Sequence, residues 1–298
     1  MTARRLVVGL LDTSAAVCAA AVARWPALER PFVVAGCAAA GTTAGRAFYR
    51  RACAQLGARL RRERRAVRSV SMFGHSLLLD VSETAGHTAY FERGLYEPAL
   101  SAIVARLQEG DTFLDVGANL GFFTILGARA VGPRGHVFAF EPHPQVRARL
   151  VAALALNGVA EWVEVSGGAV GLVTGERLRL HLSDRGLEFS SLVPHRAPAA
   201  AAGFTDSVEV DTVSLDDWFA EHQVEPALIK IDVEGAEDMV VGGMARTLRA
   251  RPPRRIVCET TRGSDADRML LDHGYRVRPL DAAASGNFVY DHGADPHP

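Results

Sequence analysis

From residue 111 to residue 274, short apolar segments alternate with longer segments of helical periodicity, and this alternation restricts the fold more than any other feature of the chain. Strands are predicted at 111–117, 136–142, 162–170, 227–233 and 254–260, with helices at 121–131, 145–158, 215–222, 236–250 and 264–274. Further strands are predicted at 75–82, 177–183, 207–213, 275–280 and 286–291, and a further helix at 98–108. This order is typical of an α/β fold with a mostly parallel, Rossmann-like sheet and helices on both faces.

The charges are divided unevenly along the chain. Residues 1–70 contain 13 arginines and three acidic residues, a net charge of +10, whereas residues 71–298 contain 20 basic and 31 acidic residues, a net charge of −11. We therefore expect an Ala- and Arg-rich helical extension over 1–70 and a main domain over 71–298. The acidic main domain lacks the basic surface that binds a phosphate backbone, so a nucleic-acid partner is not expected.

The extension contains two apolar segments, 6–23 and 31–45, before an Arg-rich segment that includes 59–68. It is interpreted as helices packed on the main domain, as a membrane hairpin with both Arg-rich flanks in the cytoplasm, or as a cleaved signal peptide. Asp12 opposes the hairpin, because an ionised side chain is costly in hydrocarbon. Residues 59–68 are typical of a solvated helix face that can also contact anionic lipid.

The cysteines form no metal-binding or disulfide pattern. Cys18, Cys37, Cys53 and Cys258 include no CxxC pair and have no histidine cluster nearby. This pattern favours a reducing compartment. The expected location is therefore cytoplasmic, with membrane association through the N-terminal segment left open.

A glycine-rich turn, DVGANLG at 115–121, follows the first strand of the alternating region. Ligands of parallel sheets bind at the carboxyl ends of the strands, and Gly117 and Gly121 allow a sharp turn and a close approach of the backbone. The spacing is neither GxGxxG nor that of a P-loop. Glu141 ends the next strand, twenty residues after Gly121, where a carboxylate can accept both hydroxyls of a ribose.

The segment IKIDVEGAE at 229–237 places charges at another strand end. Strand alternation puts Lys230 and Asp232 on one face, and Asp232 and Glu234 fall at the carboxyl end. Lys230 is the single lysine in a chain with 32 arginines, which suggests a need for its compact charge. Such buried charges require pairing or functional use, and an ion pair that only holds the turn is the simpler alternative.

Four motifs together resemble the FkbM-type family of S-adenosylmethionine-dependent methyltransferases: DVGANLGFFT, FEPHP, SLDDW and IKIDVEGAE. The segment GLYEP at 94–98 is also similar to that family. The resemblance covers about residues 72–290. It implies the class I methyltransferase fold with a seven-stranded sheet, S-adenosylmethionine as cofactor, and O-methylation of a hydroxyl on a sugar or natural product. Residues 166–170 lack the acidic or amide residue that related enzymes often place near the adenine.

The resemblance also implies roles for the candidate residues. Gly117, Asn119 and Gly121 would hold the methionine part of the cofactor, and Asp115 would support the turn or the amino group. Glu141 would bind the ribose. Asp232 is expected to be the base that accepts the acceptor proton, with Lys230 as its electrostatic partner.

The acceptor side and the metal dependence are less constrained. The substrate-side candidates are Glu97, Ser190, Ser191, Glu234 and Glu259, with both serines in the loop 184–206. Methyl transfer without a divalent metal is expected, because the Lys230 charge would repel a cation. The alternative is a Mg²⁺ site with Asp232 and Glu259 as ligands, as in metal-dependent O-methyltransferases of the catechol type.

Three other function classes share part of this pattern. A nicotinamide oxidoreductase shares the glycine turn and the strand-end glutamate but lacks GxGxxG. A nucleic-acid methyltransferase is opposed by the acidic main domain and by the absence of an [NDS]-P-P-[YF] motif. A non-catalytic protein that binds a nucleoside cofactor at the membrane remains the alternative to an enzyme.

Overall fold

The computed structural model describes residues 3–39, 42–63, 67–72, 75–80, 97–183, 190–193, 204–280 and 286–293. The chain divides into two compact units. One comprises Met1–Gly74 with Leu78–Tyr96, and the other comprises His75–Leu77 with Glu97–Pro298. The boundary expected at residue 70 falls inside a strand, Val67–Met72.

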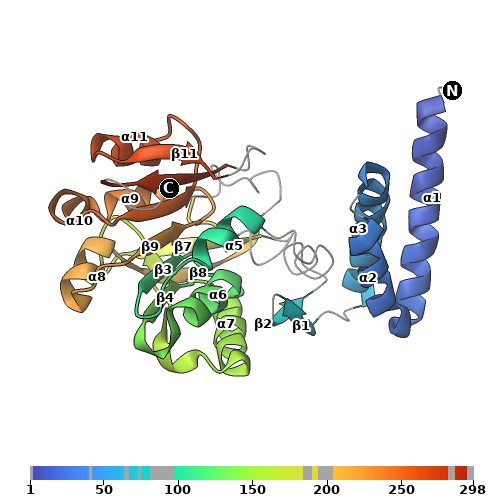
Figure 1. Ribbon diagram of the computed structural model, residues 1–298, viewed down its shortest axis with the longest axis horizontal. Helices are drawn as coiled ribbons and strands as arrows, with labels where there is room; N and C mark the ends of the chain where they lie inside the picture. The colour runs from blue at the N-terminus through green and yellow to red at the C-terminus, as the bar shows by residue number, and fades with distance from the viewer. Residues whose placement is uncertain are drawn as a thin grey trace. The chain divides into compact units, whose positions relative to one another are not determined.

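The first unit is mainly helical (Figure 1). Its elements are α1 (Ala3–Arg24), a 3-10 turn (Pro26–Leu28), α2 (Glu29–Ala39), α3 (Thr43–Glu63) and β1 (Val67–Met72). Strand β2 (His75–Asp80), which pairs with β1, is divided between the two units. Small residues such as Ala15, Ala19 and Ala52 are buried, which allows close helix packing. Asp12 pairs with Arg51 over 2.7 Å, so the charge inside the apolar run has a partner.

The Arg-rich segment and the apolar helices of this unit differ from two of the sequence-based expectations. The helical face predicted over 59–68 is interrupted, because α3 ends at Glu63 and β1 begins at Val67. Among the helices of the described part of the chain, none has the length and apolarity needed to span a membrane.

The second unit contains the expected mixed sheet. Its seven described strands run in the order β11-β12-β10-β9-β3-β4-β5. Their bounds are β3 (Thr112–Val116), β4 (His136–Phe140), β5 (Val163–Ser166), β9 (Leu228–Ile231), β10 (Arg255–Glu259), β11 (Arg276–Pro279) and β12 (Asn287–Asp291). Only β12 pairs antiparallel with its neighbours, β10 and β11. This confirms the predicted class I methyltransferase sheet.

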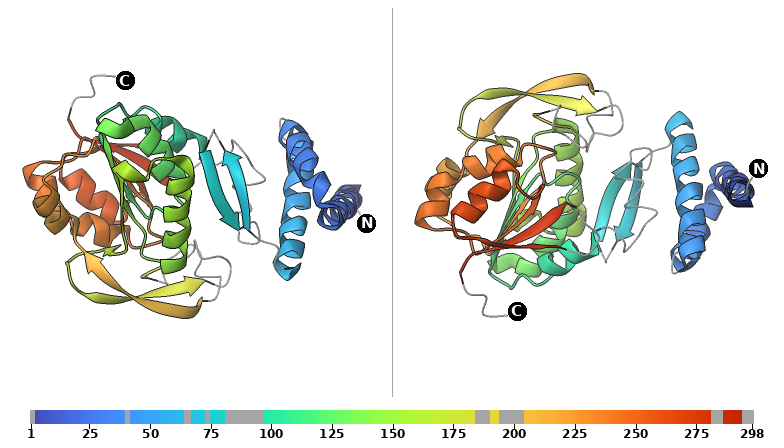
Figure 2. Two further views of the ribbon diagram at one scale, coloured as in Figure 1. Left: turned by 90° about the horizontal axis from the view of Figure 1, so that it is seen from below. Right: turned by 90° about the horizontal axis from the view of Figure 1, so that it is seen from above.

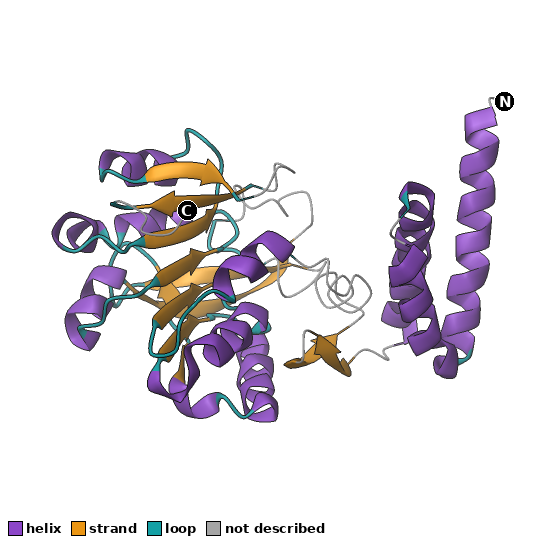
Figure 3. Ribbon diagram, viewed as in Figure 1, coloured by secondary structure: helices purple, strands orange, loops and turns teal. Residues whose placement is uncertain are grey.

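Helices cover both faces of this sheet, as Figure 3 shows. Figure 2 separates them by colour: the green helices α5 (Pro98–Val104), α6 (Phe122–Val131) and α7 (Pro144–Asn157) lie on one side, and the orange-to-red helices α8 (Leu215–His222), α9 (Glu237–Gly242), α10 (Ala245–Ala250) and α11 (Asp265–Asp272) lie on the other. Short 3-10 turns occupy Gly132–Arg134 and Ala160–Trp162. Leu114 and Val116 of β3 join the core beneath α8–α11. Strand alternation therefore turns Asp115 to the face of α6, where its carboxylate meets Thr124.

Two predicted elements are divided in the structure. Residues 162–170 were predicted as one strand, but β5 ends at Ser166 and β6 (Ala169–Val170) joins a separate sheet with β8 (Phe204–Val213) and β7 (Arg177–Ser183). The predicted helix over 236–250 breaks between α9 and α10. Gly243 lies so close to the Gly171 carbonyl oxygen that a Cβ would approach it to 2.0 Å, and its own carbonyl accepts the Asp216 N–H at 2.8 Å.

One element is shorter than expected. The helix predicted over 98–108 ends at Val104 as α5. The Asp111 carboxylate accepts the Gln108 N–H at 2.7 Å, which holds the following residues in a turn.

Candidate functional site

The glycine turn after β3 closes tightly on two neighbouring strands. The N–H groups of Gly117 and Ala118 both donate to the Phe140 carbonyl at 3.0 Å, which fixes the turn to the end of β4. Gly117 has φ +80°, and a Cβ there would lie 1.8 Å from the Asp232 carbonyl oxygen. Only glycine fits this position. Asn119 also has a positive φ, 52°, and Gly121 precedes α6 with φ +88°.

Glu141 connects the glycine turn to the start of α7. Its carboxylate accepts the N–H of Asn119 at 2.9 Å and the N–H of His143 at 2.8 Å. Burial raises the pKa of Glu141 to about 7, although these two bonds and the charges of Lys230 and Arg147 act in the opposite direction. Each oxygen keeps a second lone pair, so the group can still accept hydroxyl donors from a ligand.

Lys230 lies at the centre of the site and is 3% exposed. Its Nζ donates to the Gly117 carbonyl at 2.8 Å and lies 3.3 Å from Asp115 Oδ1 and 3.2 Å from Asp232 Oδ2. Asp115 Oδ1 faces the ammonium as an ion pair without accepting a hydrogen bond. Asp115 Oδ2 accepts the Thr124 hydroxyl at 2.6 Å. The expected ion pair therefore exists, with two carboxylates rather than one.

Asp232 follows β9 and Glu259 ends the neighbouring parallel strand β10, and their side chains are hydrogen-bonded to each other. Burial favours the protonated form of Asp232, but the Lys230 charge and hydrogen bonds from Glu259 and Lys230 bring its pKa below the usual value. Burial, the Asp232 charge and their hydrogen bond raise the pKa of Glu259 to about 9. These opposite pKa shifts favour a proton on Glu259, which donates to an ionised Asp232.

The remaining substrate-side candidates fall around this pair to different degrees. The charges of Glu234 and Glu97 contribute to the raised pKa of Glu259, which places both in its electrostatic surroundings. Ser191 is buried, and its hydroxyl donates to the Glu234 carbonyl at 2.7 Å. Ser190, next to it in sequence, is half-buried. Residues 184–189 and 194–203 of the predicted loop lie outside the described residues.

Backbone strain concentrates in the same region. Four described residues other than glycine have positive φ: Glu97, Asn119, Gln223 and Glu234. Three of them belong to the candidate site, and the fourth ends helix α8. Strained backbone of this kind clusters at functional sites, where it is part of their construction.

A cavity of about 590 Å³ adjoins the pair at Glu259. Its lining also includes Glu234, the start of α9 and the start of α11. Within the described residues, no group of three or more histidine, cysteine, aspartate or glutamate side chains is arranged to hold a metal ion. The Glu237 carboxylate accepts the Gly235 N–H at 2.9 Å and holds the turn before α9.

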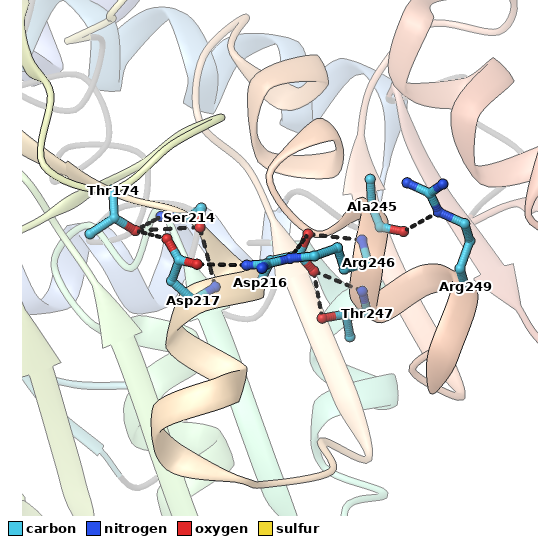
Figure 4. A network of polar contacts seen from close by, with 8 residues as sticks. All are labelled: Thr174, Ser214, Asp216, Asp217, Ala245, Arg246, Thr247 and Arg249. Atoms are coloured by element: carbon cyan, nitrogen blue, oxygen red, sulfur yellow. Dashed lines mark hydrogen bonds and ion pairs between the residues drawn. The ribbon is translucent and has the colours of Figure 1, made fainter.

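The SLDDW motif has a structural role, which Figure 4 shows. Asp216 accepts the N–H groups of Arg246 and Thr247 at 2.8 and 2.7 Å and so caps the start of α10. Asp217 accepts the Thr174 hydroxyl and one Arg246 nitrogen, both at 2.6 Å. Trp218 is buried in the core. The motif therefore ties α8 to α10 and to the segment after β6, away from the strand-end carboxylates.

Sequence reasoning missed some contacts of the site. Thr124 was not singled out, although a hydroxyl in an otherwise apolar helix beside Asp115 was an available signal. The bond from Ser191 to Glu234 had no signal, because it joins residues 43 positions apart. The N-cap role of His143, whose Nδ1 accepts the Gln145 N–H at 3.2 Å, was also missed.

The sequence region that carries this site matches a known protein family. Residues 115–277, more than half of the chain, match the methyltransferase FkbM domain. The hexuronic acid methyltransferase AglP of Haloferax volcanii is 28% identical over 160 residues, which are 52% of this chain and 58% of that protein. The match thus spans less than two thirds of the relative.

Two solved structures are similar to this chain at low sequence identity. An S-adenosylmethionine-dependent O-methyltransferase from Thermotoga maritima is 15% identical, with a TM-score of 0.39 over 67% of each chain. Fibrillarin from Aeropyrum pernix, in complex with S-adenosylmethionine, is 13% identical, with a TM-score of 0.38 over 65% of this chain and 73% of that one. The match over residues 115–277 shows that the chain belongs to the FkbM family of S-adenosylmethionine-dependent methyltransferases.

Proposed function

We propose that the protein methylates a hydroxyl group on a sugar or sugar-containing natural product. The observation that supports this most directly is the ionised Asp232 held between Lys230 and a protonated Glu259 at the carboxyl edge of the sheet. An alcohol is a poor nucleophile while it keeps its proton, so an O-methyltransferase needs a group that accepts that proton. The name of the Haloferax volcanii relative, a hexuronic acid methyltransferase, supports a sugar acceptor.

The residues around the glycine turn fit S-adenosylmethionine. The absence of a side chain at Gly117 keeps the turn tight against Asp232, and Glu141 presents a carboxylate twenty residues beyond Gly121. Glu141 would accept the ribose hydroxyls, and the turn from Gly117 to Gly121 would hold the methionine part. Asp115 would support the turn, because both of its oxygens already face Lys230 or Thr124.

Proton removal is assigned to Asp232. The cofactor supplies a methyl group on a sulfonium, which is already activated for displacement. The protein therefore has to align the acceptor and accept its proton. Lys230 directs its ammonium at Gly117, Asp115 and Asp232, so it acts by positioning Asp232 rather than by contact with the acceptor. Glu259 orients the same carboxylate from the other side.

We propose that turnover does not require a divalent metal. The ammonium of Lys230 lies 3.2 Å from Asp232 and opposes a cation beside it. The test is a methyl-transfer screen of hydroxylated glycosides with labelled S-adenosylmethionine, before and after EDTA treatment. Unchanged turnover supports the proposal, whereas complete loss that Mg²⁺ restores would make Asp232 and Glu259 metal ligands. The screen also tests the non-catalytic alternative, which predicts cofactor binding without transfer to any acceptor.

We propose further that the N-terminal unit holds a cytoplasmic enzyme at an anionic membrane surface. Val17, Trp25 and Val34 are 64%, 59% and 68% exposed, and residues 1–70 carry a net charge of +10. Exposed apolar side chains beside arginines are suited to the interface of an anionic bilayer. Flotation with vesicles that contain phosphatidylserine tests this, and equal recovery on purely zwitterionic vesicles would argue against it.

A further inference from the structure

The hydroxyl of Ser191 makes its hydrogen bonds inside the protein. The residue is 1% exposed, and its Oγ donates to the Glu234 carbonyl at 2.7 Å and accepts the Val193 N–H at 3.0 Å. A serine hydroxyl has a single proton to donate. Because that proton already goes to Glu234, the Ser191 side chain has no donor left for an acceptor molecule.

The backbone of Ser191 fixes where this hydroxyl lies. Its N–H donates to the His181 carbonyl at 3.0 Å, and its carbonyl accepts the His181 N–H at 2.9 Å, so the residue is paired with β7. Strand β7 pairs in turn with β8 in the separate sheet of β6, β8 and β7. This sheet is therefore the support from which the Ser191 hydroxyl reaches the turn after β9.

The turn that receives this bond has an unusual backbone. Glu234 has φ +53° and the following Gly235 has φ +98°, so two successive residues lie in the left-handed region. Glutamate lacks the freedom of glycine there, and such a conformation persists only where surrounding contacts hold it. Ser191 holds the turn at the Glu234 carbonyl, and the Glu237 carboxylate holds it at the Gly235 N–H, 2.9 Å away.

Asp232, the proposed base, lies two residues before Glu234 at the start of the same turn. Its N–H donates to the Val116 carbonyl at 3.1 Å, and a Cβ on Gly117 would lie 1.8 Å from its carbonyl oxygen. Asp232 is thus fixed on one side by β3 and the glycine turn. We infer that Ser191 is a positioning residue for methyl transfer, which fixes the other side by holding the turn in the conformation that places Asp232 for proton removal. The inference rests on the proposed function, because it takes Asp232 as the base.

The test replaces Ser191 by alanine in the full-length protein. Loss of the hydroxyl should let the turn relax and shift the Asp232 carboxylate, and a shift of about 1 Å can slow a reaction by roughly a hundredfold. For the glycoside that the methyl-transfer screen identifies as the best acceptor, kcat should fall by about tenfold or more, while the dissociation constant for S-adenosylmethionine changes by less than about twofold.

The pH profile gives a second readout. Burial would still raise the pKa of Asp232 in Ser191→Ala, whereas the contacts with Lys230 and Glu259 that lower this pKa would weaken. The rise of kcat with pH should therefore move to higher pH. A serine that served only the stability of the fold would leave this profile unchanged.

Hydrogen exchange, followed by mass spectrometry, gives a readout that needs no acceptor. The amides of Val233 and Gly235 donate to the Glu237 carboxylate while the turn is held. In Ser191→Ala, peptides that cover residues 232–237 should exchange faster, and peptides from β3 and β4 should keep the wild-type rate.

Ser214→Ala is the matched control, because Ser214 is another buried serine whose hydroxyl accepts a backbone N–H, that of Asp217 at 3.2 Å. At a temperature where both variants are folded, it should keep the wild-type kcat, pH profile and exchange over residues 232–237. Ser191→Cys keeps a side chain of similar size with a weaker donor, so its kcat should be intermediate. It supplies the same readouts if the alanine variant does not fold.

The inference and the proposed function fail in different ways. A wild-type kcat or an unchanged exchange rate over residues 232–237 in Ser191→Ala would overturn the inference, and so would equal losses in Ser214→Ala. A raised KM for the glycoside at unchanged kcat would also overturn it, because Ser191 would then act in acceptor binding. Faster exchange over residues 232–237, in a protein that binds S-adenosylmethionine but methylates no glycoside, would contradict the proposed function alone.

Discussion

The Nζ of Lys230 donates a hydrogen bond to the carbonyl oxygen of Gly117 at 2.8 Å, across 113 positions of sequence. The bond joins the end of β3 to its neighbour β9 at the carboxyl edge of the sheet. The same ammonium faces the carboxylates of Asp115 and Asp232. One side chain therefore supports the glycine turn and the proposed base together, so changes at position 230 should affect both.

Replacement of Lys230 should be costly even where the substitute is similar in size. Lys230→Met leaves the fully buried Asp115 without its cationic partner, and we expect a loss of about 3–5 kcal/mol in the free energy of unfolding. Lys230→Arg keeps the charge but must fit a planar guanidinium into a 3%-exposed site, so it should also be impaired. Urea unfolding checks both variants, and wild-type stability in Lys230→Met would contradict the role given to the ion pairs.

Glu141→Ala should weaken the binding of S-adenosylmethionine by about 2–3 kcal/mol, because a charge-assisted pair of hydrogen bonds to the ribose would be lost. Calorimetry on both forms measures this difference. Equal affinities would remove Glu141 from the cofactor site.

The stability of the free protein should fall with rising pH because of Glu141. The pKa of Glu141 is about 7 in the folded state, against an ordinary value of 4.5, so the folded state binds more protons than the unfolded state between these pH values. The free energy of unfolding should therefore decrease from pH 5 to pH 8 by on the order of 2–3 kcal/mol through this group. Urea unfolding of the wild type and of Glu141→Gln at both pH values isolates the contribution. Parallel pH dependences in the two proteins would show that the pKa is not raised.

Asp216→Ala should destabilise the fold without a direct effect on the cofactor. The variant loses the carboxylate that accepts two N–H groups and the Thr247 hydroxyl at the start of α10, at an expected cost of about 2 kcal/mol. At a temperature where the variant is folded, its dissociation constant for S-adenosylmethionine should equal that of the wild type. A large change in that constant would mean that SLDDW takes part in binding.

A chain that begins at Val70 should be soluble and should bind S-adenosylmethionine with wild-type affinity, because the sheet and its strand-end residues belong to the second unit. It should no longer float with anionic vesicles. Circular dichroism and calorimetry check the first expectation. An unfolded product would show that the N-terminal unit is needed for the core.

The sequence alone was sufficient to predict which strand ends meet. Asp115, Glu141 and Asp232 each follow or end an apolar segment that alternates with helices, and the carboxyl ends of parallel strands lie along one edge of a sheet. That inference needs only local periodicity and a topological rule. It therefore held for the sheet, for most helices and for the neighbouring positions of Asp232 and Glu259.

What only the tertiary structure decided is how the charges at that edge are paired. The sequence indicated an ion pair for Lys230, but not that its ammonium would join Asp115, Asp232 and the Gly117 carbonyl. Nor did it indicate that Glu259 would hold a proton for Asp232. Such pairing depends on separations of about 3 Å between groups that are far apart in sequence and on the exclusion of water around them. Periodic patterns of apolar residues encode neither, because they specify which face is buried and not which polar atoms meet there.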